Sequence, residues 1–177
     1  MHVTAWKIPA DEHRAVVVGL SGKVAIEATA LVDSAAALVM LGDHDGATRA
    51  LAKGRDLWTP TPADPFGDPD RTSARIELAR KRLDVADAFA AASLRRWKSG
   101  RQISRTQTGI VQATIHVTAG EPRGLQLAHD AVTEVGKLGS ARVRGQLEPL
   151  VDALDTRPGA DAQELARMAR QVASTRA

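Results

Sequence analysis

Residues 35–60 read AAALVMLGDHDGATRALAKGRDLWTP, and this stretch decides the fold of the chain. Small residues stand where two helix backbones must approach each other, and large apolar residues occupy the neighbouring turns. Gly42 falls between the two helical patterns, at the place where a turn is needed. The pattern therefore predicts a pair of helices, over residues 23–41 and 47–58, that fold back on each other.

The same stretch resembles the tetratricopeptide repeat (TPR), a helix–turn–helix unit of about 34 residues that stacks into superhelical arrays. Five positions match the small and large residues of that repeat: Ala35, Gly42, Ala47, Leu51 and Gly54. Leu31 and Leu38 stand where the family usually has aromatic residues, and the chain contains no tyrosine. The resemblance implies an all-α fold, a TPR-like superhelix of antiparallel helix hairpins (an α–α solenoid) with about seven or eight helices.

A weaker match to this unit lies in residues 110–132, IVQATIHVTAGEPRGLQLAHDAV. Gly120 would form its turn, and Gly124, Ala128 and Ala131 would share one helix face. Several residues before Gly120 are β-branched, so the segment also reads locally as a strand. The chain has no other convincing strand to pair with it, and we expect packing between helices to prevail.

The remaining sequence divides into helices separated by breaks in the apolar pattern. A short helix is expected near residues 10–19. Residues 59–70, TPTPADPFGDPD, hold four of the eight prolines and are predicted to form a loop. Apolar residues spaced by three and four then predict a single amphipathic helix over residues 72–97. Two further helices are expected over residues 104–118 and 122–137.

The C-terminal region carries three boundary signals. Ser140 is placed to cap the N-terminus of a helix. Pro149 predicts a kink or a restart within the apolar pattern, and Asp161 with Glu164 has the spacing of a capping box. We therefore expect a single TPR-like helical domain over residues 1–177, divided into an N-terminal segment with a short helix (1–22), a first hairpin (23–58), a Pro-rich loop (59–70), middle helices (71–137) and C-terminal capping helices (138–177).

Composition restricts the classes of protein to which the chain can belong. Hydrophobic residues make up 44% of the 177 residues and aromatic residues only 3%, so the core must be built mainly from Ala, Leu and Val, which suits close-packed helices. The absence of cysteine excludes a disulfide framework, a thiolate zinc site and a cysteine nucleophile. The sequence shows neither a signal peptide nor a run of about 18 apolar residues. We expect a cytoplasmic protein that does not associate with a membrane.

Positive charge is concentrated in one part of the chain. The net charge is +3, yet residues 71–105 hold ten Lys or Arg against three Asp or Glu. Part of this excess surrounds Trp97 in RRWKSGRQISRTQ, where Arg could pair with phosphate or carboxylate and Trp could stack. Trp97 also continues an apolar stripe, and basic residues near a helix C-terminus commonly offset the helix dipole, so a purely structural role is the alternative. The candidate partner- or ligand-binding residues are Arg95, Arg96, Trp97, Arg101, Arg105 and His116.

No catalytic, cofactor-binding or metal-binding motif is recognised, so we do not expect an enzyme or a need for a cofactor. The five histidines include no pair with metal-ligand spacing beside a carboxylate base. Phosphate-loop and nucleophile-elbow motifs are also absent from the sequence. An enzyme that uses His116 or His129 with a neighbouring carboxylate is an alternative, provided that these groups cluster in a pocket.

Several phrases between about residues 10 and 173 resemble the C-terminal TPR-like regions of actinomycete (Streptomyces-type) helix–turn–helix transcriptional regulators of the Xre type. The longest are AIEATALVDSAAALVMLGDHDGA and SARVRGQLEPLVDALDTRPGADAQELARMARQ. In that family this region is taken to sense a ligand or peptide, or to dimerise, while a separate N-terminal domain of about 60 residues reads DNA. Residues 1–22 are too short to hold that domain, so direct binding to DNA is not expected.

The sequence thus predicts a non-enzymatic regulatory or sensory module related to transcriptional regulators. Its partner would be a peptide, a protein segment or a small ligand that binds in a helical groove. Formation of a homodimer is left open, because Ala-rich helix faces can complete a core within one chain or between two. The alternative function is a basic accessory protein that contacts nucleic acid through residues 95–105.

Overall fold

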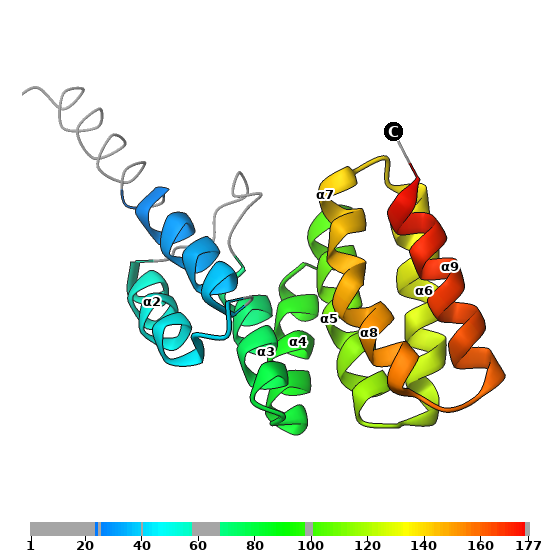
Figure 1. The fold of residues 1–177 in the computed structure, drawn as a ribbon. Coiled ribbons are helices and arrows are strands. Elements are labelled where there is room, and N and C mark those ends of the chain that lie inside the picture. The colour runs from blue at the N-terminus through cyan, green and yellow to red at the C-terminus, as the bar shows by residue number, and fades with distance from the viewer. Residues whose placement is uncertain (1–23, 25, 40, 58–67, 98–100, 176–177) are drawn as a thin grey trace, which may run out of the picture.

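The structure is a computed structural model that describes residues 24, 26–39, 41–57, 68–97 and 101–175. Throughout these residues the secondary structure is helical and contains no strand, so the prediction of an all-α fold is confirmed. Figure 1 shows an array of antiparallel helix hairpins. The short helix expected near residues 10–19 and most of the loop expected over residues 59–70 lie outside the described residues.

The first hairpin joins a helix over residues 26–39 to α2 (His44–Leu57), as the sequence predicts. Gly42 lies in the turn with φ +79°, a left-handed conformation that favours glycine. A Cβ atom on Gly54 would lie only 3.1 Å from the Leu31 Cβ atom, so the missing side chain allows the two helices to approach closely. The core of this hairpin is the cluster of Val32, Ala35, Ala47 and Leu51 with Ile76.

The second hairpin consists of α3 (Pro69–Ala79) and α4 (Leu83–Arg96), so the prediction of one helix over residues 72–97 is wrong. The chain reverses at Lys81, which has φ +61° although it is not glycine. The Lys81 and Arg82 N–H groups donate to carbonyls in the last turn of α3, and the Arg82 guanidinium donates to Glu77 Oε1 at 2.7 Å. Because no Gly or Pro marks this turn, the apolar spacing continues through it and resembles one long helix.

The third hairpin pairs α5 (Gln102–Thr118) with α6 (Pro122–Lys137), and the prediction for its second helix is confirmed at both ends. Gly120 has φ +73° in the turn, as its place in the pattern predicts. The β-branched segment is helical, and Thr114 donates its hydroxyl to the Ile110 carbonyl at 2.8 Å. A Cβ atom on Gly124 would lie 2.7 Å from the His116 carbonyl carbon, so α5 and α6 meet almost backbone to backbone.

The C-terminal part contains α7 (Ala141–Arg144), a 3₁₀ turn (Gly145–Leu147), α8 (Glu148–Thr156) and α9 (Ala160–Ser174). Ser140 caps α7 by accepting from the Val143 N–H at 3.4 Å, and Pro149 lies in the first turn of α8, so both predictions are confirmed. The predicted capping box is wrong. The N-cap of α9 is Gly159, and no side chain caps that helix; Glu164 binds Arg167 instead.

The hairpins stack so that their first helices lie on one side of the array. In Figure 1, α3, α5 and α8 run in the same direction, while α4, α6 and α9 run in the opposite direction. Among the described helices, α5 packs against both α3 and α4 of the preceding hairpin and against α8, and α6 packs against α9. No helix in the described ranges is long and apolar enough to span a bilayer.

Candidate ligand-binding groove

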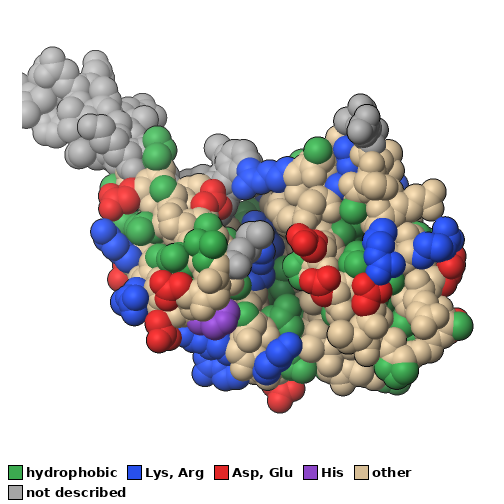
Figure 2. Space-filling view, viewed as in Figure 1, with side chains coloured by type: hydrophobic (Ala, Val, Ile, Leu, Met, Phe, Trp, Pro, Cys, Tyr) green, Lys and Arg blue, Asp and Glu red, His purple; other side chains and the backbone are tan. Residues whose placement is uncertain are grey.

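A groove of about 430 Å³ opens between the first helices of successive hairpins. Ile110, Val111 and Thr114 of α5 form its floor, with Leu78 of α3 on one side and Pro149 of α8 on the other. Figure 2 shows the hollow near the middle of the face in view, with hydrophobic side chains inside it and Lys or Arg side chains at its edge. The site is therefore an apolar channel with a charged rim.

Helical periodicity explains why these residues share the groove. On α5 the lining residues Ile110, Thr114 and Thr118 recur every four residues, so one face of the helix lines the floor. Thr114 uses its hydroxyl hydrogen within α5, in the bond to the Ile110 carbonyl. The central part of the floor is consequently apolar, and the polar groups of the site stand on the walls, where Arg75 of α3 faces the groove from one side and Asp152 of α8 from the other.

The α3 wall is strongly basic at one end. Arg71 stands one turn before Arg75 on the same helix face. Burial lowers the pKa of Arg71 from its usual value; the charge of Asp68 opposes that shift, and the charges of Arg75 and Arg142 add to it. Burial also lowers the pKa of Arg75. Because arginine stays protonated in proteins, these directions mean that both positive charges are held where solvent hydrates them poorly.

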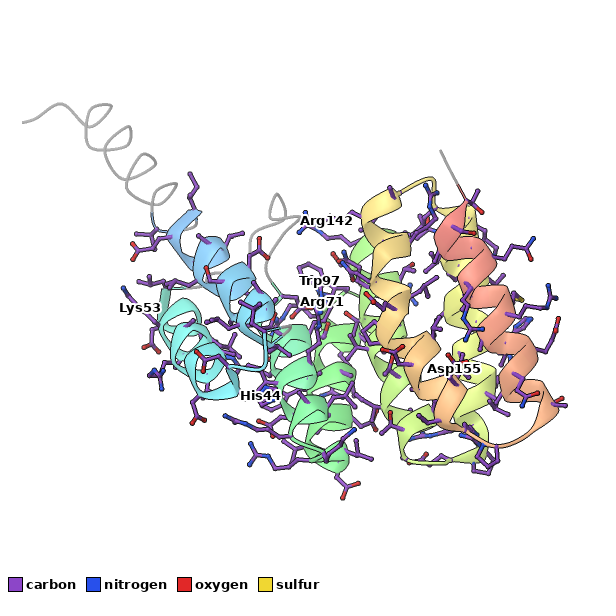
Figure 3. The ribbon with its side chains drawn as sticks, viewed as in Figure 1. His44, Lys53, Arg71, Trp97, Arg142 and Asp155 are labelled. Carbon is purple, nitrogen blue, oxygen red and sulfur yellow. The ribbon has the colours of Figure 1, made fainter. Side chains whose placement is uncertain are left out.

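Figure 3 shows Arg71, Trp97 and Arg142 gathered in the space between the α3–α4 hairpin and α7. The Nη1 atom of Arg71 is buried, and no described residue accepts a hydrogen bond from it. Asp33, on the helix over residues 26–39, also contributes to the electrostatics of Arg71, but its side chain is exposed.

Asp68 fixes the N-terminus of α3, the helix that forms this wall of the groove. It is 2% exposed and caps α3 by accepting from the Asp70 and Arg71 N–H groups. Its other oxygen accepts from the Ser93 hydroxyl at 2.5 Å and from the Trp97 indole N–H at 2.6 Å. Burial opposes ionisation of Asp68, but these hydrogen bonds and the charge of Arg71 outweigh it, so the pKa of the carboxyl lies below its usual value.

The structure separates the basic residues that the sequence singles out. Trp97 is 9% exposed, and its indole binds Asp68, so the residue belongs to the core. Arg96 donates to Asp70 at 2.5 Å. Arg95 is exposed on α4. Arg101 lies over the Trp97 ring, 5.1 Å from the centroid of the ring.

Arg101 and Arg105 also line a second hollow, of about 590 Å³, between α5 and α6. Acidic residues of α6, Asp130 and Glu134, line the same hollow. The predicted role of these arginines in binding a partner stays a prediction, and none of them lines the groove beside α3.

His116 is buried and has a structural environment. Its Nε2 lies 3.0 Å from Asp87 Oδ1 and its Nδ1 lies 3.0 Å from Glu121 Oε2, with Arg123 beside the ring. The two carboxylates contact opposite ring nitrogens, so they do not converge on one point. His129 is exposed and lies beside Asp130 instead. Within the described ranges no group of three His, Cys, Asp or Glu side chains could hold a metal ion.

Sequence reasoning missed Arg71 and Arg75, because both fall within a generally basic region and read as the polar face of a helix. One signal was available. An arginine in the first turn after Asp68-Pro69 opposes the helix dipole, which favours acidic side chains there. A second arginine four residues later extends the charge along one face. No family model, curated protein or solved structure matches this chain.

Proposed function

We propose that this chain is a non-enzymatic regulatory or sensory module whose TPR-like array of helices binds a short peptide or protein segment in the groove between α3, α5 and α8. The observation that carries the proposal is the groove itself, with its apolar floor and charged walls. Apolar grooves with a few placed polar groups are the usual form of binding sites. The resemblance to regions of Xre-type regulators supports a role in regulating transcription and a cytoplasmic location.

The dimensions of the groove suit an extended segment. Its floor follows α5 from Ile110 to Thr118, which corresponds to about 12 Å along a helix axis. About three or four residues of an extended peptide cover that length. Basic residues Arg75 and Lys81 stand on the α3 side and Asp152 on the α8 side. A segment with apolar side chains and both charges, or a small ligand of similar chemistry, would complement this lining.

A selection of displayed random peptides on the immobilised chain tests the proposal. The enriched peptides are then titrated against two variants that each add one indole. Ala153→Trp fills the groove from α8, where Ala153 lines it. Ala173→Trp adds the same ring to an exposed position on α9, outside the groove, and serves as the matched control.

We expect peptides to bind the wild type and Ala173→Trp equally, and to bind Ala153→Trp at least tenfold more weakly, a loss of about 1.4 kcal/mol. Far-UV circular dichroism of both variants checks that the helices are retained. If selection enriches no peptide, or if the enriched peptides bind all three proteins equally, the groove is not the binding site and the proposal is wrong.

The alternative role, as a basic accessory protein that contacts nucleic acid through residues 95–105, has less support. Stacking on bases requires an accessible aromatic ring, whereas Trp97 is 9% exposed. Arg96 is engaged with Asp70. Light scattering with short duplex DNA at low and moderate salt tests this role, because a complex that survives moderate salt would favour it over the peptide-binding module.

A further inference from the structure

Arg71 stands on α3 one turn before Arg75, which lines the groove, and the placement of its side chain is unusual. Its Nη1 atom is buried without a hydrogen-bond partner among the described residues, and none of the described carboxylates forms an ion pair with it. A buried charged group that lacks a partner is strongly unfavourable, because it loses its hydration without compensation. The first turn of α3 adds to this, since the positive end of a helix repels a cation.

Asp68 has the largest effect of any charge on Arg71, but its oxygens accept hydrogen bonds from other groups. Asp68 already receives hydrogen bonds from two backbone N–H groups, the Ser93 hydroxyl and the Trp97 indole. Arg96 also approaches the carboxylate of Asp68, at 3.6 Å. Asp68 therefore fixes the start of α3 and acts on Arg71 through its charge, but among the described residues the Nη1 atom of Arg71 has no hydrogen-bond partner.

Two further arginines add positive charge around Arg71, while the charges of Asp68 and Asp33 offset part of it. Arg75, one turn along α3, lines the groove, and Arg142 is close enough to lower the pKa of Arg71. Figure 3 shows Arg142 on the α7 side of Arg71, across the space between the hairpins. Guanidinium groups bind carboxylate and phosphate through paired N–H donors, so this end of the groove has the chemistry of an oxyanion site.

We propose that the groove ligand carries an oxyanionic group, a carboxylate or a phosphate, that binds Arg71 and Arg75 at the α3 end of the groove while its apolar part covers the floor. This inference rests on the function proposed above and specifies the ligand. The anion supplies the hydrogen-bond acceptor that the Nη1 atom of Arg71 lacks, and the apolar floor fixes which way the ligand lies.

The test uses thermal unfolding of the full chain in sodium phosphate, sodium acetate and sodium chloride at one pH and one ionic strength. An anion that binds only the folded state raises the midpoint, by about 3–6 °C when its concentration is ten times its dissociation constant. Acetate and phosphate distinguish the two sources of an oxyanion, and chloride controls for screening.

Three variants locate the effect. Arg71→Leu removes the guanidinium and keeps apolar bulk, Arg75→Leu does so one turn later, and Arg49→Leu is the matched control at an exposed position of α2. We expect the midpoint increase in the wild type and in Arg49→Leu, its loss in Arg71→Leu and its reduction in Arg75→Leu.

Equal midpoints in the three salts for the wild type, or an equal increase in Arg71→Leu, would overturn the anion site. Should Arg71→Leu fail to fold, an anion effect in Arg75→Leu as large as in the wild type would overturn it as well. The peptide experiment separates this result from the function. If Ala153→Trp weakens peptide binding and Arg71→Leu does not, the proposed peptide-binding function is retained and only the anion site is rejected.

Discussion

Gly124 offers the sharpest test of how α5 and α6 pack. A Cβ atom at this position would lie 2.7 Å from the His116 carbonyl carbon and 2.8 Å from both the His116 oxygen and the Val117 nitrogen. Ordinary contacts of a Cβ atom begin near 3.4 Å, so Gly124→Ala requires the two backbones to separate by about 0.7 Å. These are main-chain atoms within a helix, and they cannot rotate away as a side chain would.

The expected energy follows from two opposing terms. Overpacking at a tight contact costs about 1–3 kcal/mol, and replacing glycine by alanine in a helix recovers up to about 1 kcal/mol. We expect Gly124→Ala to reduce the free energy of unfolding by about 1–2 kcal/mol. For a chain of 177 residues the midpoint of thermal unfolding would fall by about 2–8 °C.

Gly136→Ala is the matched control in the same helix. Its Cβ atom would meet only Val172 Cγ2, at 3.9 Å, so the variant should be as stable as the wild type or more stable. Urea and thermal unfolding followed by circular dichroism at 222 nm measure both variants. If Gly124→Ala is no less stable than the wild type, α5 and α6 do not meet backbone to backbone and the reasoning fails.

Three further predictions concern other parts of the array. Asp68→Ala should lower the free energy of unfolding by about 3 kcal/mol in urea titrations at pH 7, since it removes the cap of α3 and the partner of buried donors. Because the pKa of Asp68 is lowered from 3.8, its ionised form stabilises the fold above that pH. The wild type should therefore lose this stability on acidification below about pH 4, while Asp68→Ala does not. An equal loss of stability in the two proteins on acidification would contradict this prediction. His116→Ala should lower the free energy of unfolding by about 2–4 kcal/mol, because it removes the link between α4 and α6. The control His129→Ala should change it by no more than about 0.5 kcal/mol. Similar losses for the two variants in calorimetry would argue against the buried network around His116. Lys81→Gly should raise stability by about 0.5–1 kcal/mol by relieving its left-handed backbone, and a lower melting temperature would show that the turn is not strained.

The helix boundaries that the sequence predicts well are those with a local chemical signal. Gly42 and Gly120 take positive φ in turns, Ser140 caps α7, and Pro149 begins a new helix. Each of these residues changes what its own backbone can do, so its effect is readable without the tertiary fold. Small residues within helices give a second kind of signal, which is only partly readable. Gly54 and Gly124 indicate that another helix approaches closely, but the sequence does not say which helix it is.

The break between α3 and α4 could not be read in this way. It depends on a lysine in an unfavourable conformation, held by carbonyls of α3 and by the pairing of Glu77 with Arg82. The groove was equally hidden, since Arg75, Val111 and Asp152 meet only when three hairpins stack. Trp97 shows the opposite error, because its basic neighbours suggest a surface site while its indole serves as a buried hydrogen-bond donor.

The apolar interior of the array is divided into separate clusters of very different size. The largest joins α5 to α9, whereas the first hairpin is attached to α3 through a small cluster in which Ile76 is the α3 member. Such an array opens in steps, and each step exposes its own amide hydrogens to exchange with solvent. Deuterium should therefore enter α2 at a lower opening free energy than α5 or α8. The wall of the groove that carries Val39 would then open and close more often than the floor.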